Sequence, residues 1–392
     1  MENLWEEPLP ETVFTAVEQV DIHLWQQILA LAALSVPLDD KDEIIFTLSR
    51  VCREWRVAVN NCPQIWATIP PIVTKDLESA ARALSSLSYA KRYLERSGTL
   101  PLDFSLLIVD DVVILPNNGW ENVFEVFLDH SERWRSVDVD TSLNILPALQ
   151  RVKGRLHALE KLRIRASPPP FHHMEVQQAL VEMRLDCFSE APRLKHLDLG
   201  ISSHSSKIDV SVPLHLLHSI TFVSCTVNNL YENLCSSPHN LRQLIVKSDV
   251  LSQSYPTLPT VTFPQLEHLV YSGQFNARFL DSLTLPALTN LEFRANGGHI
   301  SVRGLNTKIV ALLTRSKCAL QHLSLGRMAK PVPEELKEIF TLTPILTHLD
   351  VCSLTSSELK SPAPSFLNCS TWSLGSSPRT LVCCVKSSTA RW

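Results

Sequence analysis

Four histidines recur at one position of a short sequence unit that repeats through the second half of the chain. They are His196, His268, His322 and His348. Imidazole titrates near neutral pH, so histidines stacked along one face could form a polar, partly titratable column that binds a partner. The simpler interpretation is that this position needs only a polar group beside a sheet. Three other copies of the unit indeed carry Ser219, Gln243 and Asn290 there.

Other chemistry has little support in the sequence. No acidic or thiol group recurs beside these histidines, so a metal site is not expected, and no cofactor is predicted. The adjacent acids Asp39-Asp40 and Asp110-Asp111 would point apart on a helix or strand, which argues against paired acid and base catalysis. The chain contains no nucleophile elbow, phosphate loop, zinc-protease helix or dinucleotide fingerprint. We therefore predict no catalytic residue, and the less favoured alternative is an enzyme whose site only the fold assembles.

Composition limits the compartment and the partners. The 392 residues are 45% hydrophobic with a net charge of −4, which gives no electrostatic reason to expect nucleic acid or a membrane as partner. The ten cysteines include no Cys-x-x-Cys pair, so structural thiols are expected. Residues 1–19 hold five Glu and no basic residue, unlike a signal peptide, and no apolar run could span a membrane. We predict a cytoplasmic and/or nuclear protein.

The repeated unit is apolar at its first, fourth and sixth positions. Nine copies start at Trp134, Leu159, Leu194, Leu217, Leu241, Leu266, Leu288, Leu320 and Leu346, at intervals of 22 to 35 residues. Such a period is typical of leucine-rich repeats, in which a short strand points alternate residues into a stack and a return segment covers the other side.

The return segments and the prolines fit that interpretation. Five segments are apolar at helical spacing, and we expect helices there: 176–187, 230–235, 275–283, 305–313 and 336–340. Pro192, Pro264, Pro286 and Pro344 each stand two residues before the first Leu of a unit, where proline ends a helix and extends the chain. A doubly wound α/β domain is the alternative, but it needs longer apolar strands and a Gly-rich turn, and the chain has only 10 Gly.

Two amphipathic helices and a turn precede the repeats. Asp21 is placed to cap the first helix, in which Leu24, Trp25, Ile28, Leu29 and Ala32 share one face. The second helix begins near Asp42 and places Ile45, Leu48, Cys52, Trp55 and Val59 at helical steps, and a turn then carries Ile65, Trp66 and Ile69. About fifty residues cannot bury all these large groups, so some of them should meet another surface.

This segment resembles an F-box of the large fungal F-box families. The resemblance lies in Leu24-Trp25-x-x-Ile28-Leu29, Leu48-Ser49-x-Val51-Cys52-Arg53-x-Trp55-Arg56 and Pro63-x-x-Trp66, with Asp21-Ile22 near the place of the family's usual Leu-Pro. In that family the helices dock on the Skp-type adaptor of SCF ubiquitin ligases, and leucine-rich repeats can follow the F-box. The resemblance thus covers residues 20–352 and implies an adaptor and an unknown protein substrate as partners. It implies adaptor contacts at Leu24, Trp25, Ile28, Leu29, Leu48, Val51, Cys52, Trp55 and Trp66.

The expected fold class is α/β, with a small all-α F-box-like module before a leucine-rich-repeat-like solenoid of short parallel strands alternating with helices. We expect an acidic, flexible N-terminus at 1–19, the helical module at 20–70, a bracing helix within 71–99 that ends at Gly98, the solenoid at 100–352, and a disordered low-complexity tail at 353–392. The expected function is that of a substrate receptor in a ubiquitin ligase. The alternative is an interaction scaffold outside such ligases, whose helices pack on its own repeats.

Overall fold

The chain folds into two compact units that each combine helices with parallel strands. The computed structural model describes residues 20–73, 80–108, 120–167, 182–201, 207–223, 240–247, 260–272, 278–294, 305–325, 333–350, 372–374 and 381–384. The first unit comprises Met1–Ser142 and Arg155–Leu159, and the second comprises Leu143–Gly154 and Glu160–Trp392. The predicted α/β class is confirmed, with a helical N-terminal region and parallel strands that alternate with helices.

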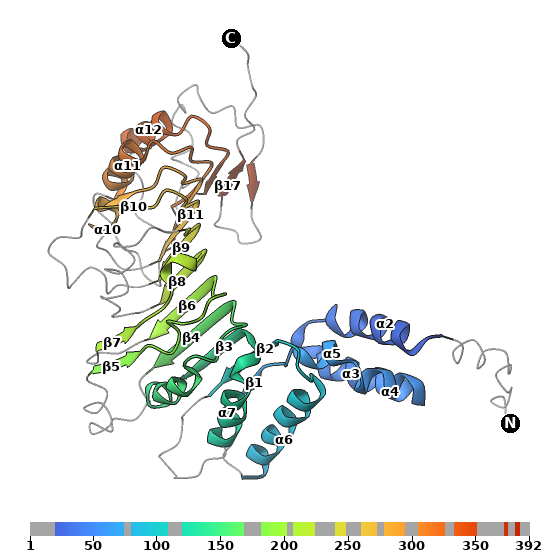
Figure 1. The fold of residues 1–392 in the computed structure, drawn as a ribbon. Helices are drawn as coiled ribbons and strands as arrows, with labels where there is room; N and C mark the ends of the chain where they lie inside the picture. The colour runs from blue at the N-terminus through green and yellow to red at the C-terminus, as the bar shows by residue number, and fades with distance from the viewer. Residues whose placement is uncertain are drawn as a thin grey trace, which may run out of the picture. The chain divides into compact units, whose positions relative to one another are not determined.

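The first unit places a helical region before three parallel strands (Figure 1). Its helices are α2 (Ile22–Leu34), α3 (Lys41–Val51), α4 (Arg53–Asn60), α5 (Pro63–Ala67), α6 (Ala80–Arg96) and α7 (Trp120–Asp129), with 3-10 turns at Leu38–Asp40 and Ser131–Arg133. Its strands are β1 (Ile72–Val73), β2 (Leu102–Leu107) and β3 (Trp134–Ser142), and β2 lies between the other two. Strand β1 lies within the segment for which the sequence predicted only a bracing helix.

Local signals fix the ends of these helices, at Asp21 and Gly98 as predicted. The Asp21 carboxylate accepts a hydrogen bond from the backbone N–H of His23 at 2.9 Å, which caps α2. Pro63 occupies the first turn of α5, where a missing N–H costs nothing. After α6, Gly98 has a φ of 57°, a left-handed conformation that glycine adopts without steric strain.

The predicted second helix is in fact two helices that meet at Cys52. This residue is extended, with φ −154° and ψ 176°, so the helical hydrogen bonds stop there. Its thiol accepts a hydrogen bond from the backbone N–H of Trp55 at 3.4 Å and thereby caps α4, and the Arg56 side chain donates to the carbonyl of Ser49 at 2.9 Å. The apolar residues keep helical spacing across the break, which is why the pattern alone predicted a single helix.

The second unit is a long sheet whose first eight strands are parallel. In sheet order these are β4 (Lys161–Ser167), β6 (His196–Ile201), β8 (Ser219–Val223), β9 (Gln243–Lys247), β11 (His268–Ser272), β13 (Asn290–Arg294), β14 (His322–Ser324) and β15 (His348–Asp350). Helices α10 (Arg278–Asp281), α11 (Leu305–Ser316) and α12 (Pro333–Leu342) lie on one side of the strands (Figure 1). With β3, all nine predicted repeat positions hold a strand of a parallel sheet.

Equivalent leucines stack in register along this sheet. The fourth residue of the unit is paired from strand to strand and is at most 3% exposed at Leu162, Leu197, Ile220, Leu244, Leu269, Leu291 and Leu323. Each such side chain contributes about 1.5–3 kcal/mol when it is fully buried. The stack buries a row that no single repeat could cover.

The same main-chain hydrogen bonds recur at the start of successive strands. Backbone N–H groups of Lys195 and His196 both donate to the carbonyl of Glu160, at 2.9 and 3.1 Å, and the equivalent pair at Thr347 and His348 donates to Gln321, at 2.8 and 3.0 Å. The four repeat prolines occupy the second position of a tight turn that the first Leu closes, as in the 3.2 Å bond from Leu288 N–H to the Leu285 carbonyl. These turns set where each strand begins.

The return segments match the predictions in part. Helices α11 and α12 are confirmed, and α10 is a short helix inside 275–283. The predicted helix at 176–187 is wrong where the structure describes it, because β5 (Glu182–Leu185) pairs with β7 (Lys207–Val210) in a small parallel sheet. A second small sheet pairs β10 (Val261–Thr262) with β12 (Leu283–Thr284), and a 3-10 segment, Leu143–Val152, precedes β4. The predicted helix at 230–235 lies outside the described residues.

The C-terminal segment contains two strands that the sequence did not predict. Strand β17 (Leu381–Cys384) pairs antiparallel to β15, and β16 (Trp372–Leu374) pairs antiparallel to β17. Backbone groups at the end of the parallel sheet thus find partners in a hairpin. The rest of the predicted disordered tail, and the acidic segment 1–19, lie outside the described residues.

Lys41 is a charged residue in the core of the first unit, with 1% of its surface exposed. Its ammonium group donates to the carbonyl of Thr68 and lies 6.0 Å from the ring of Tyr93. Burial lowers the pKa of Lys41 from 10.5 to about 8, although the charges of Asp42 and Asp103 oppose this change. The folded state therefore releases this proton at a lower pH than the unfolded chain does.

This difference predicts that Lys41 contributes a rise in stability as pH increases above about 8. In that range the unfolded state binds more protons, so the free energy of unfolding increases with pH. The test is the free energy of unfolding of the wild type minus that of Lys41→Met, measured by urea titrations followed by tryptophan fluorescence. This difference should increase by about 1–2 kcal/mol between roughly pH 7.5 and 9.5. The subtraction removes the contributions of the buried thiols and tyrosines, whose raised pKa values make stability fall as pH increases. A difference that does not change with pH would contradict the prediction.

Candidate functional site

Helix α2 is apolar on two opposite sides. Leu29 and Ala33 face the core and are buried. Leu24, Ile28 and Leu31 follow one another at steps of four and three residues on the other side, and Leu31 is 72% exposed. A surface helix normally presents charged and polar groups on that side, so this apolar stripe needs an explanation other than the core of the unit.

Exposed apolar side chains are concentrated in the helices that begin the chain. Of eleven large exposed apolar residues in the part of the chain that the structure describes, nine lie between residues 22 and 57. They are Ile22, Leu24, Ile28, Leu31, Leu34, Leu38, Phe46, Val51 and Val57, and the other two are Val73 and Ile345. Single exposed apolar residues are common on proteins, whereas a concentration of this kind marks an interaction surface.

The predicted adaptor contacts differ in exposure. Leu24, Ile28 and Val51 are exposed, and Trp25, Leu48, Cys52 and Trp55 are half-buried. Leu29 and Trp66 are buried, at 1% and 2% exposed, so they belong to the core and not to the candidate surface. The Trp66 indole N–H donates to the carbonyl of Val59 at 2.9 Å, and its ring packs on Tyr93 of α6 with 4.9 Å between centroids. Trp66 thus holds α5 against α6.

Two half-buried tryptophans join the helices that carry the candidate surface. The rings of Trp25 on α2 and Trp55 on α4 lie 5.0 Å apart and are tilted by 52°. The side chain of Gln26 adds a 2.8 Å hydrogen bond to the carbonyl of Asn61. Sequence reasoning missed Leu31 and Leu34, although Leu31 lies seven residues after Leu24, a spacing that places both on one face of a helix.

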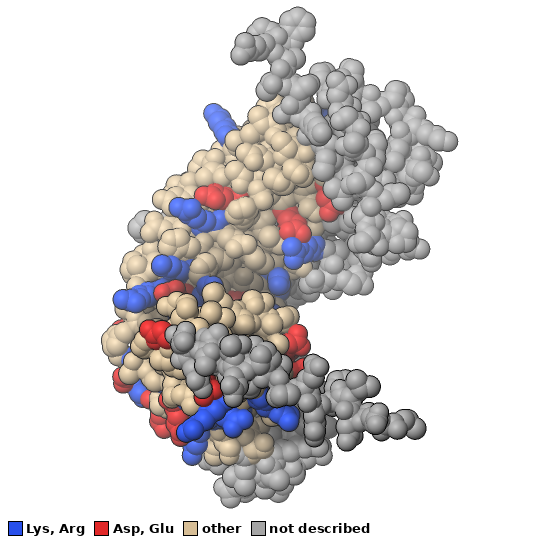
Figure 2. Space-filling model, turned by 90° about the vertical axis from the view of Figure 1, so that its right-hand side faces the viewer, with Lys and Arg blue, Asp and Glu red and all other residues tan. Residues whose placement is uncertain are grey.

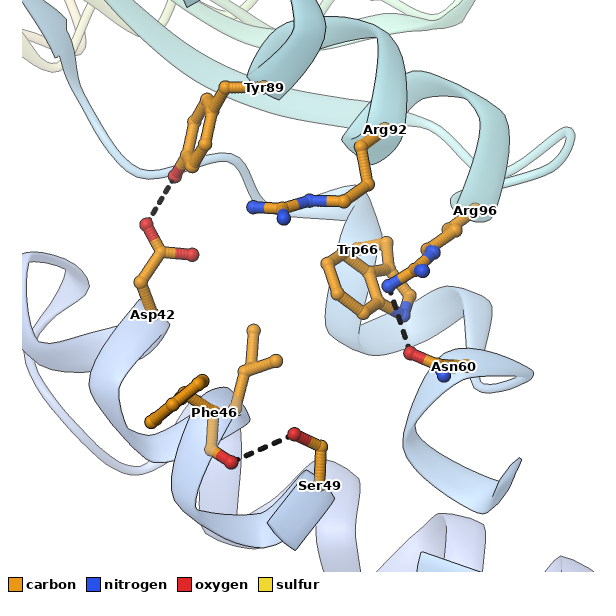
Figure 3. Close-up of a pocket in the computed structure, with 9 residues that line it drawn as sticks. Asp42, Phe46, Ser49, Asn60, Trp66, Tyr89, Arg92 and Arg96 are labelled. Atoms are coloured by element: carbon orange, nitrogen blue, oxygen red, sulfur yellow. Dashed lines mark hydrogen bonds between the residues drawn. The ribbon is translucent and has the colours of Figure 1, made fainter. Parts of the chain in front are cut away.

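A basic and aromatic pocket lies beside these helices (Figure 3). Its cavity volume is about 410 Å³, and its lining comes from Asp42, Ile45, Phe46 and Ser49 of α3, Asn60 of α4, Trp66 of α5, and Tyr89, Arg92 and Arg96 of α6. The two carboxylate oxygens of Asp42 accept hydrogen bonds from the hydroxyls of Tyr89 and Tyr93, at 2.7 and 2.6 Å. Burial, with these bonds, raises the pKa of both tyrosines. We refer to this cavity as the arginine pocket.

The four repeat histidines lie in one register row of the second unit, as the repeated unit predicts. Sheet pairing runs from His196 through Ser219 and Gln243 to His268, and then through Asn290 to His322 and His348. Only the last two histidines touch, as stacked rings 4.2 Å apart. Burial lowers the pKa of His322, and the charges of His348 and His268 lower it further. The row is therefore a mixed polar ladder that ends in a histidine pair.

Charged side chains on the exposed face of the sheet pair with one another. Arg163 lies 3.5 Å from Asp198, and Arg294 lies 2.5 Å from Glu292. Figure 2 shows basic and acidic side chains next to one another at several places on the face that it draws. Exposed pairs of this kind contribute little to stability, and they shape which partner surface the sheet can accept.

Three of the described thiols show the chemistry of core groups. Cys52, Cys62, Cys187 and Cys318 are free, and burial raises the pKa of the last three, to about 12 for Cys187. Cys62, Cys187 and Cys318 therefore stay protonated at neutral pH and are poor nucleophiles. Within the described ranges, no group of three or more His, Cys, Asp or Glu side chains could hold a metal ion.

No family model, curated protein or solved structure matches the chain. None of the described helices is long and apolar enough to cross a membrane.

Two neighbouring residues of α2 test the assignment of its faces. Ile28 is 43% exposed, whereas Leu29 is 1% exposed. We expect Leu29→Ala to lower the free energy of unfolding by about 2–4 kcal/mol, because it opens a cavity, and Ile28→Ala to change it by less than about 1 kcal/mol. Urea titration of both variants measures the difference. Equal losses would mean that Ile28 is also a core residue.

Proposed function

We propose that this protein is an F-box substrate receptor of an SCF-type ubiquitin ligase. The observation that carries the proposal is the concentration of exposed apolar side chains on the helices from Ile22 to Val57, where the sequence resembles an F-box. These helices would bind the Skp-type adaptor through the stripe of Leu24, Ile28 and Leu31, together with Val51 and the half-buried Trp55. The face of α2 that packs on its own unit stays in place, so binding needs no unfolding.

The strands of the second unit would form a leucine-rich-repeat-like solenoid that presents a protein substrate. Their exposed face carries the polar row that contains His196, His268, His322 and His348, and it has the paired charges that favour a specific partner. The receptor then performs no bond chemistry. Holding the substrate near the activated ubiquitin raises the effective concentration of its lysines at the ligase.

An interaction scaffold outside ubiquitin ligases is the second candidate. In that case the chain's own repeats would cover the apolar helices. The resemblance of these helices to an F-box favours an external partner. No described feature favours an enzyme, and we do not propose one.

A matched pair of variants tests the adaptor. Ile28→Asp should weaken binding of the purified Skp-type adaptor by at least about tenfold, because it places a carboxylate in an apolar contact. Ile345→Asp is the control, since Ile345 has nearly the same exposure, 45% against 43%, and belongs to the second unit. Calorimetric titration of the full chain measures both affinities, and circular dichroism checks that each variant is folded.

Three results would contradict the proposal. The parent chain could fail to bind the adaptor, folded Ile28→Asp could bind as the parent does, or Ile345→Asp could lose as much affinity as Ile28→Asp. The first result would favour the second candidate, an interaction scaffold outside ubiquitin ligases. The other two would mean that the adaptor binds elsewhere on the chain.

A further inference from the structure

The arginine pocket is lined by two guanidinium groups that each lie over an aromatic ring. Arg96 lies 4.5 Å from the Trp66 ring, and Arg92 lies 5.5 Å from the Tyr89 ring. Arg50 does not line the pocket, but it lies 5.0 Å from the ring of Phe46, which does. Stacking of this kind holds the plane of a guanidinium against the ring and leaves its N–H edge available.

The positive charge of the pocket is not balanced by its own acid. Among the described residues of the lining, Asp42 is the one acid, and its two oxygens already accept the tyrosine hydroxyls. Arg96 donates to the Asn60 side-chain oxygen at 2.8 Å, a neutral acceptor. Burial lowers the pKa of Arg96, and the charge of Arg92 lowers it further, as expected for like charges held close together. Figure 3 shows Arg92 reaching into the space between Tyr89 and Trp66.

Apolar groups form the remaining wall. Phe46 lies across from Arg92 and Arg96 (Figure 3), Ile45 and Trp66 add apolar lining, and Ser49 and Asn60 supply small polar groups. The cavity of about 410 Å³ lies within the usual range for ligand pockets and is large enough for one or two side chains, not for a folded domain. A ligand that matches it has an anionic group joined to an apolar body.

We propose that the arginine pocket binds an acidic peptide segment of a partner protein, in which an Asp or Glu side chain neighbours an aromatic residue. The carboxylate would accept hydrogen bonds from Arg92 and from the free N–H edge of Arg96. The aromatic side chain would pack on Phe46 and Ile45. Carboxylates match the planar fork of arginine, and the complementarity of charge selects against basic peptides.

This site is separate from the adaptor contact of the proposed function and does not depend on it. The pocket opens between α3, α4, α5 and α6, whereas the stripe of Leu24, Ile28 and Leu31 belongs to α2. The test therefore contains no adaptor, and its failure would leave the adaptor proposal untouched.

The test is calorimetric titration of the full chain at low ionic strength with the capped peptide Glu-Glu-Phe-Glu-Glu. We expect measurable binding that weakens as salt increases, and no binding of the neutral peptide Gln-Gln-Phe-Gln-Gln. Arg92→Gln should weaken binding by about tenfold, the effect of losing one charge-assisted hydrogen bond. Lys91→Gln is the matched control, because Lys91 is an exposed cation on the same helix that does not line the pocket, and it should bind as the parent does.

The full chain with Glu2, Glu6, Glu7, Glu11 and Glu18 changed to Gln is titrated in parallel, since the chain's own acidic residues could compete for the pocket. Binding by either chain, lost in Arg92→Gln and kept in Lys91→Gln, supports the proposal. The proposal is overturned if neither chain binds, or if Lys91→Gln weakens binding as much as Arg92→Gln. Binding only of a peptide with phosphoserine in place of the Glu residues would also overturn it and assign the pocket to phosphate.

Discussion

The stacking of equivalent leucines in register is the constraint on which the second unit depends. Each repeat supplies two or three inward residues, which is too little to form a core alone, so the row from Leu162 to Leu323 is buried only because neighbouring strands pair without a shift. The paired N–H donation to one carbonyl at each strand start keeps that register. Insertions of different length between the strands change the return segments and leave the row intact.

The second unit buries nearly all of the large apolar side chains that the structure describes in it, and the first unit does not. Where repeats stack, the described chain leaves a single large apolar residue exposed, Ile345, although its strands are rich in leucine. The helices from Ile22 to Val57 leave nine exposed in a much shorter stretch. The same chain thus covers apolar side chains closely in one part and not in the other. Poor packing in general does not explain the difference, whereas a binding surface does.

The interior of the first unit is organised around polar contacts as well. Lys41 is buried against the carbonyl of Thr68, and the neighbouring Asp42 joins α3 to two tyrosines of α6. Buried polar groups of this kind fix how helices meet, because only one arrangement satisfies them. They hold α3 and α6 at the separation that leaves the arginine pocket open.

The sequence predicted the repeated elements better than the site. The apolar positions of the repeated unit located nine strands, because period-two alternation and a regular interval are properties of local sequence. The break at Cys52 and the strand at Glu182–Leu185 were missed, since a side-chain cap and pairing with a distant strand decide them. Within the site, the sequence could not tell that Leu29 is buried and Ile28 exposed. A helix that is apolar on two opposite sides has no single polar face to show which side meets solvent.

The arginine pocket is a second feature that the sequence alone could not predict. Its residues come from four helices between Asp42 and Arg96, and their charges and rings have no common spacing in the sequence. Arg50 and Arg92 lie over rings of their own helices, four and three residues away, whereas a tertiary contact is needed to bring Arg96 over Trp66. Phe46 connects this pocket to the exposed apolar group, since it lines the cavity and is 58% exposed. A ligand that covers Phe46 from the pocket also removes part of the exposed apolar surface of helices α2 to α4. If the pocket ligand changes the affinity of the chain for the adaptor, linkage requires that the adaptor change the affinity for that ligand by the same factor.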